Sequence, residues 1–431
     1  MNIVQQSSTV VLLFGVVALG GCSDHPTGTA PTAQPLSADR AAGLSSIQGL
    51  ASPEWQEIAR NFVMQSTISR NSAAATRVYA YLGVAQHDAV VRAEDAIGGN
   101  ESETELEPWN GLGRIGRSRL EADRGAVAGA SAAVLTYFDP AEEQLFEATV
   151  QEQANAGPGQ PHPDFARGET VGRQVGAEAI ARALTDGFDL PWTGTVPVGP
   201  GLWFSSAKPP QPPVNAQLPG MRPFFLTAAD QFRPAPPPAF GSPPYLAALA
   251  EVRNISDART AEQVNIAQFW AKGAGTSTIS GFWNVMATGW IEESGLRERE
   301  ATHVFALLDA AMMDAAIGCF DAKLTYWFIR PPQADPAIKL IPAIGLPNHP
   351  SYPSAHSCFS GAAAEMLSEF FPAKADSLNA MVDQAGLARI YAGIHYRFDV
   401  DEGQQLGRRV ARFVSEVDRS RGSAVAERRG L

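Results

Sequence analysis

Two cations, Lys323 and Arg330, have the residue types and the spacing that binding of a multiply charged anion requires. They lie seven residues apart, which is two helical turns, so both would project from one face of a helix that Pro331 ends or kinks. A point-charge ammonium and a planar guanidinium together suit an oxyanion. Arg389 adds a third cation further along the chain. The sequence therefore predicts an oxyanion site.

The residues Pro353–His356 predict the start of a helix. They precede the small and apolar run SCFSGAAAEML, and Ser354 is a preferred N-cap residue. Free backbone N–H groups and the positive end of the helix dipole would then face the same anion as the cations.

His395 and Asp399 supply reactive groups close to the third cation in sequence. His395 offers a nitrogen that could attack or ligate, and Asp399, four residues on, could hold its ring in one tautomer. Taken singly, a cation or a histidine is more often a solvated or structural residue. Two cations, a Ser-x-His helix start and an Arg-x5-His-x3-Asp segment in this order are improbable by chance, so together they predict chemistry.

KLTYWFIRP, PSAH and the Arg389–His395–Asp399 segment resemble the signature of the superfamily of type 2 phosphatidic acid phosphatases and vanadium haloperoxidases. That signature is Lys-x6-Arg-Pro, Pro-Ser-Gly-His and Ser-Arg-x5-His-x3-Asp, and every charged member matches. Ala355 stands where the family has Gly, and Ala388 stands where it usually has Ser. The N–H at Ala355 can still donate, but its methyl group could crowd the anion or strain a Gly-like backbone angle.

The resemblance implies one pocket for two activities, because vanadate and phosphate are close in shape and charge. In a haloperoxidase, His395 would ligate the vanadium of vanadate, His356 would help deprotonate hydrogen peroxide, and a halide would be oxidised. In an exported acid phosphatase, His395 would attack the phosphorus of a phosphoester and form a phosphohistidine, while His356 would protonate the leaving group and then activate water. Neither activity needs haem or zinc, and the sequence has no motif for either. The residues expected to hold the oxygens of the anion are Lys323, Arg330, Ser354, Ala355 and Arg389.

His349 favours the haloperoxidase branch. In haloperoxidases the position five residues before the serine carries an aromatic residue or a histidine near the vanadate, and bromide-oxidising members have histidine. The alternative is that His349, within LPNHPSYP, caps a turn. The chain is long enough for two helical bundles, which also favours the haloperoxidase branch. The phosphatase is the second alternative. A non-catalytic anion-binding lipoprotein is a third alternative, but His356 and His395 argue against it, because anion capture needs only cations and N–H groups.

The elements that must position these residues are helical. Apolar residues recur at three and four from Ser52 onwards and strand-like alternation is scarce, so the sequence predicts an all-α fold. Three pairs of segments match in the same order: VYAYLGVAQHDAV with VFALLDAAMMDAA, GASAAVLTYFDP with GAAAEMLSEFFP, and Gly168-x3-Gly172 with Gly403-x3-Gly407. They predict two related helical bundles, and the resemblance implies four helices in each. Only the second copy carries the site, because Ile97 occupies the position of Lys323 in the first.

A Pro-rich stretch separates the two predicted bundles. Its density of prolines forbids helix interiors and central strands, but it contains seven Trp and Phe residues, which a flexible linker would lack. We expect an ordered connection that packs over the helices and shapes the entrance of the site, with a plain linker as the alternative. The expected division is a signal peptide at 1–21, a polar tether at 22–50, an N-terminal scaffold bundle at 51–190, the connection at 191–245 and a C-terminal bundle with the site at 246–420.

The net charge limits the classes of partner, and the first residues predict the cellular location. A net charge of −12 argues against a nucleic-acid partner and against general attraction to anionic membranes. The apolar run STVVLLFGVVALGGC predicts an export signal, and Leu19–Cys22 resembles a bacterial lipoprotein cleavage box that would leave Cys22 lipidated. We therefore expect an exported protein, a periplasmic or outer-membrane lipoprotein, and the sequence leaves room for an oligomer. Cys319 and Cys358 could pair in an oxidising compartment or remain free buried thiols.

Overall fold

The fold is built from α-helices. The computed structural model describes residues 49–97, 114–156 and 160–421, so the predicted signal peptide and Cys22 lie outside the described residues. Within the described ranges there is no β-strand, only an isolated bridge between Leu202 and Phe328, which confirms the predicted all-α class. The helices are α2 (Ser52–Gln65), α3 (Ser72–Ile97), α4 (Arg114–Phe138), α5 (Glu143–Ala154), α6 (Pro163–Ala183), α7 (Pro243–Asp257), α8 (Ala261–Phe269), α9 (Thr278–Ser294), α10 (Glu298–Tyr326), α11 (Pro331–Ala334), α12 (Ala355–Phe370), α13 (Ala375–Tyr391) and α14 (Arg397–Arg421).

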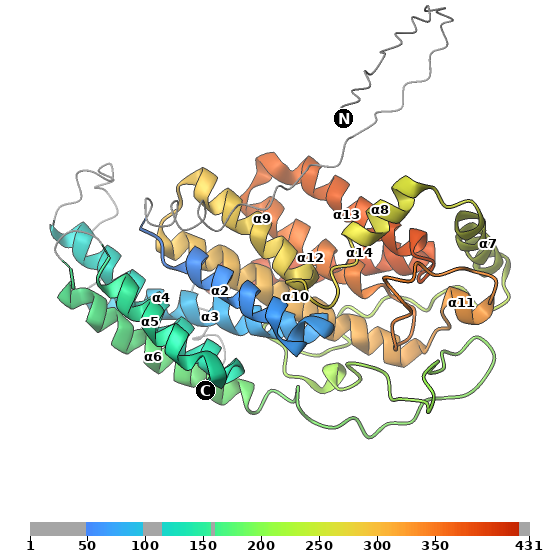
Figure 1. Ribbon diagram of the computed structural model, residues 1–431, viewed down its shortest axis with the longest axis horizontal. Coiled ribbons are helices and arrows are strands. Elements are labelled where there is room, and N and C mark those ends of the chain that lie inside the picture. Colours follow the sequence, from blue (N-terminus) through green and yellow to red (C-terminus); the bar gives the residue numbers. More distant parts are fainter. Residues whose placement is uncertain (1–48, 98–113, 157–159, 422–431) are drawn as a thin grey trace, which may run out of the picture.

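The order of the helices repeats once along the chain. The series α2, α3, α4, α5 and α6 recurs as α9, α10, α12, α13 and α14, and α3 packs against α10 in the centre of the molecule (Figure 1). α9 and α10 begin 226 residues after α2 and α3 (278 minus 52, and 298 minus 72). This spacing agrees with the predicted duplication.

The matched glycines make the same helix contact in both halves. A Cβ atom on Gly172 of α6 would lie 2.1 Å from the carbonyl oxygen of Ala126 in α4. A Cβ atom on Gly407 of α14 would lie 2.2 Å from the carbonyl oxygen of Cys358 in α12. Glycine is required at both positions because the two backbones touch there. In the second half this contact holds α14 against the first turn of α12.

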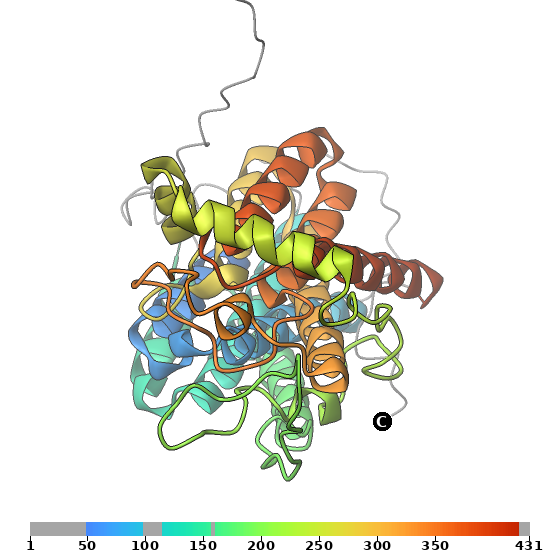
Figure 2. The same cartoon turned by 90° about the vertical axis from the view of Figure 1, so that its right-hand side faces the viewer.

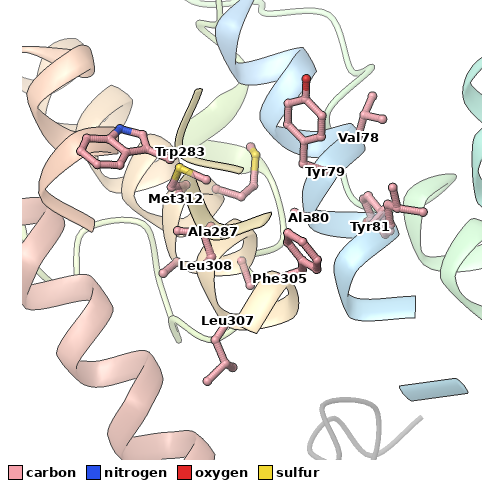
Figure 3. Packing of buried hydrophobic residues seen from close by; sticks show 14 of the residues in the cluster. Val78, Tyr79, Ala80, Tyr81, Trp283, Ala287, Phe305, Leu307, Leu308 and Met312 are labelled. Atoms are coloured by element: carbon pink, nitrogen blue, oxygen red, sulfur yellow. The ribbon is translucent and has the colours of Figure 1, made fainter. Parts of the chain in front are cut away.

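α10 is the central helix of the core. Almost every residue from Val304 to Lys323 is buried, and Figure 3 shows Phe305, Leu308 and Met312 of α10 packed between α3 and Trp283 of α9. Of the described helices, only α10 is long and apolar enough to span a membrane, and 94% of its apolar window is buried inside the protein. The C-terminal end of this rigid helix is therefore a fixed platform for Lys323.

The Pro-rich connection packs against the second half of the chain. Between Ala183 and Pro243 it contains no α-helix. The side chains of Trp203 and Phe224 are buried and fix the connection to the helices. Asp314 of α10 accepts hydrogen bonds from three successive backbone N–H groups of the connection, those of residues 224–226, at 2.6–2.9 Å. Beyond the connection, α7 lies beside the loops between α11 and α12 (Figure 2), where Lys339 N–H donates to Ser256 Oγ at 2.7 Å.

The glycine contact generates a test of the packing. Gly407→Ala should destabilise the protein by about 2 kcal/mol, because the new methyl group would overlap two backbone atoms and push α14 away from α12. Gly289→Ala in α9 is the matched control, since a Cβ atom there meets nothing within 4 Å and should stabilise the helix by up to about 1 kcal/mol. Chemical unfolding of both variants measures the difference. Equal stability of the two variants would contradict this packing.

Candidate active site

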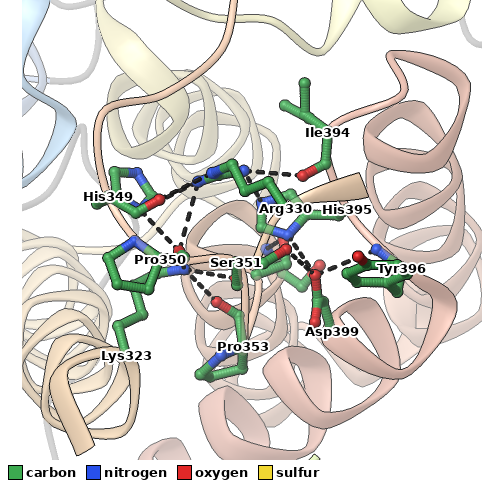
Figure 4. A network of polar contacts seen from close by, with 12 residues as sticks. Lys323, Arg330, His349, Pro350, Ser351, Pro353, Ile394, His395, Tyr396 and Asp399 are labelled. Carbon is green, nitrogen blue, oxygen red and sulfur yellow. Dashed lines mark hydrogen bonds and ion pairs between the residues drawn. The ribbon is translucent and has the colours of Figure 1, made fainter. Parts of the chain in front are cut away.

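Separate segments of the second half converge on one site (Figure 4). The charges of Lys323 and Arg389 both act on His356, and Arg330 lies against His395, so the predicted residues are brought together. The contributions are Lys323 from α10, Arg330 from the N-cap of α11, Ser354 to His356 from the start of α12, Arg389 from the last turn of α13, and His395 and Asp399 from the turn into α14.

Lys323 holds the loop that leads into α12. The side chain is fully buried, and Nζ donates to the carbonyl oxygens of Pro350 (2.8 Å), Ser351 (2.8 Å) and Pro353 (2.5 Å). All three ammonium donors are used in this way, so the lysine acts on an anion through its charge. Burial lowers the pKa of Lys323 to about 8, which leaves it charged at neutral pH.

Arg330 lies between two histidines. Its Nε donates to the carbonyl oxygen of His349 at 2.8 Å, and one terminal nitrogen lies 3.1 Å from Nδ1 of the same residue. The other terminal nitrogen donates to the Ile394 carbonyl at 2.8 Å and lies 3.5 Å from Nε2 of His395. Nδ1 of His349 also lies 3.1 Å from the Pro350 carbonyl oxygen, so it can either accept from Arg330 or donate to that carbonyl. His349 is thus a partner of Arg330 rather than only a turn cap.

His395 is oriented by Asp399. Nδ1 of His395 lies 2.8 Å from Oδ2 of Asp399, and the same oxygen accepts from Ser351 Oγ at 2.5 Å and from the Tyr396 N–H at 3.1 Å. A carboxylate beside Nδ1 selects the tautomer with the proton on that nitrogen. Nε2 of His395 therefore keeps its lone pair and faces Arg330.

The protonation states at this pair suit a nucleophile or a metal ligand. Burial, together with the charge of Arg330, holds the pKa of His395 well below its usual range, so the imidazole is neutral. Burial raises the pKa of Asp399 to about 6, while the Ser351 hydrogen bond and the Lys323 charge oppose that rise. At neutral pH the pair is a neutral histidine oriented by an ionised carboxylate.

His356 is held by a main-chain carbonyl oxygen. Its Nε2 lies 3.1 Å from the carbonyl oxygen of Ala271, in the segment between α8 and α9. A carbonyl can only accept, so Nε2 carries the proton and Nδ1 keeps its lone pair. Burial and the neighbouring Arg389 lower the pKa of His356 to about 3, which keeps the ring neutral without an anion. His356, Ala355 and His349 are only partly buried, so they are the predicted site residues most exposed to solvent.

The start of α12 corrects one expectation. Ser354 is the N-cap, and its Oγ accepts from the Ser357 N–H at 3.4 Å, as the sequence predicts. Ala355 is the first residue of the helix and is not among the residues with positive φ, so the backbone there is not Gly-like. Of the two alternatives at Ala355, backbone strain is not found, because an L residue adopts this conformation freely, and crowding of the anion stays a prediction.

Arg389 leaves a buried donor without a partner. One terminal nitrogen donates weakly to the Ala267 carbonyl at 3.4 Å, while the buried Nε has no partner. An orphaned charged donor in the interior is costly unless a ligand satisfies it. The site therefore holds three buried cations, Lys323, Arg330 and Arg389, against one buried carboxylate, Asp399. This surplus of positive charge and the orphaned donor fit a multiply charged oxyanion.

The two remaining cysteines are free thiols. Cys319 and Cys358 are both buried, and Sγ of Cys319 donates to the Pro353 carbonyl at 3.8 Å. Of the two alternatives left open by the sequence, free buried thiols is the one found. In the described part of the chain, no group of three or more His, Cys, Asp and Glu residues is arranged to hold a metal ion.

Comparisons with known proteins agree with this architecture. Residues 304–422 match the family model of the PAP2 superfamily, and they include all the charged residues of the site. No curated protein matches the chain in sequence. Among solved structures, the chain is similar to the first bacterial vanadium-dependent iodoperoxidase, with 22% identity and a TM-score of 0.67 over 84% of this chain and 96% of that one.

A second solved structure, the holo-type bacterial vanadium-dependent chloroperoxidase, has 13% identity and a TM-score of 0.66 over 86% of this chain and 96% of that one. The chain therefore has the all-α fold of the vanadium haloperoxidases, and its C-terminal part matches the model of the PAP2 superfamily. This confirms the resemblance that the three-part signature predicts.

Sequence reasoning misses three contributors to the site. Ser351 bonds the Asp399 carboxylate, Asn348 fixes the backbone before His349, and the Ala271 carbonyl contacts His356. Ser351 and Asn348 lie in an irregular Pro-rich loop without a recognisable pattern. The third contact uses a main-chain oxygen, which carries no residue-type signal at all.

The lowered pKa of Lys323 generates a pH prediction. As pH rises through about 8, Lys323 loses its proton and the site loses one positive charge, so affinity for a dianion should fall by up to about tenfold per pH unit above that point. Calorimetric titration with molybdate, whose charge is constant between pH 7 and 9, measures this. Lys323→Met should bind more weakly at pH 7 and lose the slope. An unchanged slope in that variant would show that another group titrates.

Proposed function

We propose that this chain is a vanadate-dependent haloperoxidase-like enzyme that uses hydrogen peroxide to oxidise a halide. The observation that carries the proposal is the neutral His395, whose Nδ1 is held by Asp399 while Nε2 stays available beside Arg330. The fold shared with a bacterial vanadium-dependent iodoperoxidase and a chloroperoxidase supports the same class.

The residues present fit vanadate. His395 would hold the vanadium through Nε2, and the surplus charge of the three buried cations would balance the oxygens. The N–H groups that begin α12, capped by Ser354, and the orphaned Nε of Arg389 would donate to those oxygens. When bound, vanadate supplies the activation of peroxide toward a halide. Buried cations that are fixed before the anion arrives need no rearrangement to bind it.

His356 is placed to move a proton. Its Nε2–H is engaged by the Ala271 carbonyl, so Nδ1 is the free base and can accept a proton from peroxide or water. An anion bound beside His356 would raise the pKa of the ring, because a negative charge stabilises the imidazolium. The same ring could then return the proton later in the cycle.

A phosphatase is the second candidate, and the same histidine favours it. A neutral Nε2 beside a guanidinium equally suits attack on phosphorus, with a phosphohistidine as the intermediate. The substrate would be a phosphoester, and His356 would protonate its leaving group. The match to the PAP2 superfamily is compatible with either activity.

One pair of assays separates the two functions. The protein without residues 1–21, freed of phosphate and loaded with orthovanadate, should brominate a phenolic dye in the presence of peroxide and bromide. The same protein without vanadate is tested for hydrolysis of p-nitrophenyl phosphate. Hydrolysis that vanadate inhibits, without bromination, would replace the haloperoxidase by the phosphatase.

Variants of the two histidines test the assigned roles. His395→Ala should abolish turnover and weaken vanadate binding, because it removes the only proposed ligand to vanadium. His356→Ala should lower kcat by about a hundredfold or more, while vanadate affinity stays within about threefold, because the ring moves a proton and does not hold the anion. Full turnover in His356→Ala would contradict its role as acid and base.

We further propose that the protein is exported and anchored through a lipid on Cys22. The support is the apolar run and the cleavage-box resemblance at Leu19–Cys22. Both lie outside the described residues, so the proposal rests on sequence alone.

A further inference from the structure

The connection between the two halves forms hydrogen bonds with the segments that carry Arg330 and His349. The Trp203 N–H donates to the Trp327 carbonyl at 2.7 Å, and the Ile329 N–H donates to the Gly201 carbonyl at 3.0 Å. Gln333 Nε2 donates to the Phe204 carbonyl at 2.5 Å. These bonds clamp the chain on both sides of Arg330.

Asn348 forms a second clamp, immediately before His349. Its Nδ2 donates to the Pro212 carbonyl at 2.8 Å, and its Oδ1 accepts from Ser205 Oγ at 3.0 Å. Its backbone carbonyl accepts from the Val214 N–H at 2.9 Å. Both ends of the amide and the main chain of Asn348 are therefore held by one short stretch of the connection, residues 205–214.

The residue after this clamp is the main support of Arg330. Of the three contacts of the Arg330 guanidinium that are shorter than 3.5 Å, two end on His349, one at its carbonyl oxygen and one at Nδ1. A shift of the His349 backbone would therefore turn the guanidinium plane. Because a planar fork recognises an oxyanion by direction as well as by charge, such a turn weakens binding.

We propose that Asn348 is a positioning residue for the anion site, acting through His349 on Arg330, and that residues 205–214 of the connection are the fixed frame against which it acts. This inference rests on the proposed function only for the identity of the anion. Because the hydrogen bonds of Asn348 act on Arg330 whatever the anion is, we expect an effect on the binding of any tetrahedral oxyanion. It also gives the connection a function that a plain linker would not have.

The test compares three variants by calorimetric titration with molybdate, alongside thermal unfolding. Asn348→Ala removes both side-chain bonds and should weaken molybdate binding by about tenfold or more. Ser205→Ala removes the bond to Oδ1 and the acceptor for the Ala207 and Gln211 N–H groups, but it leaves Nδ2 of Asn348 bonded to Pro212, so it should weaken molybdate binding by about two- to threefold. Gln231→Ala is the control, because the side chain of Gln231 accepts from Thr227 within the same connection and its loss should leave affinity unchanged.

A structural role alone would predict a different pattern. If Asn348→Ala and Gln231→Ala bind molybdate equally, within about twofold, Asn348 does not position the site. The mild Ser205→Ala variant keeps the test informative if Asn348→Ala folds poorly, and an unchanged affinity there also contradicts the proposal. In the brominating enzyme, Asn348→Ala should raise the vanadate concentration needed for half activity, and His349 should give the same phenotype when changed to Ala.

Failure of this inference and failure of the proposed function are distinguishable. If the graded loss of molybdate affinity is found in a protein that does not brominate, the clamp stands and the haloperoxidase is wrong. If bromination is found and the three variants share the affinity of the parent chain, the function stands and the clamp is wrong.

Discussion

The structure depends on keeping three cations in the interior without neutralising them. Buried charges are costly, and the usual compensation is an opposite charge. Here Lys323 and Arg330 are satisfied mainly by main-chain carbonyl oxygens, which accept hydrogen bonds but carry no net charge. The single carboxylate, Asp399, is directed at His395. The positive charge therefore remains available, and an oxyanion is the partner that completes the site.

That constraint explains the architecture around the site. Carbonyl oxygens can be aimed at a cation only if irregular backbone is held firmly, and the loop from His349 to Pro353 is held by Lys323, by Asp399 and by the connection. The first half of the molecule, whose helices repeat those of the second, places no cation at the position of Lys323. Its helices α3 and α4 instead support α10, and its C-terminal continuation becomes the frame of the site.

The sequence predicted the parts of this site that are encoded locally. The charged signature, the helix start at Ser354, the all-α class and the duplication were predictable because spacing and residue type carry them. The alternative of backbone strain at Ala355 is not found, since the family position did not reveal the backbone angle in this chain. Ser351, Asn348 and the Ala271 carbonyl were not predictable, because each acts through contacts with segments distant in sequence or through a main-chain atom.

The most direct test of this account is X-ray absorption at the vanadium edge on the protein loaded with orthovanadate. The account predicts one nitrogen ligand in the first coordination shell of the wild-type protein, and its loss in His395→Ala. A second variant, Asp399→Asn, should keep the nitrogen but bind vanadate more weakly, because the tautomer of His395 is no longer enforced. An all-oxygen shell in the wild-type protein would contradict the central claim that the buried cations present an oxyanion to Nε2 of His395.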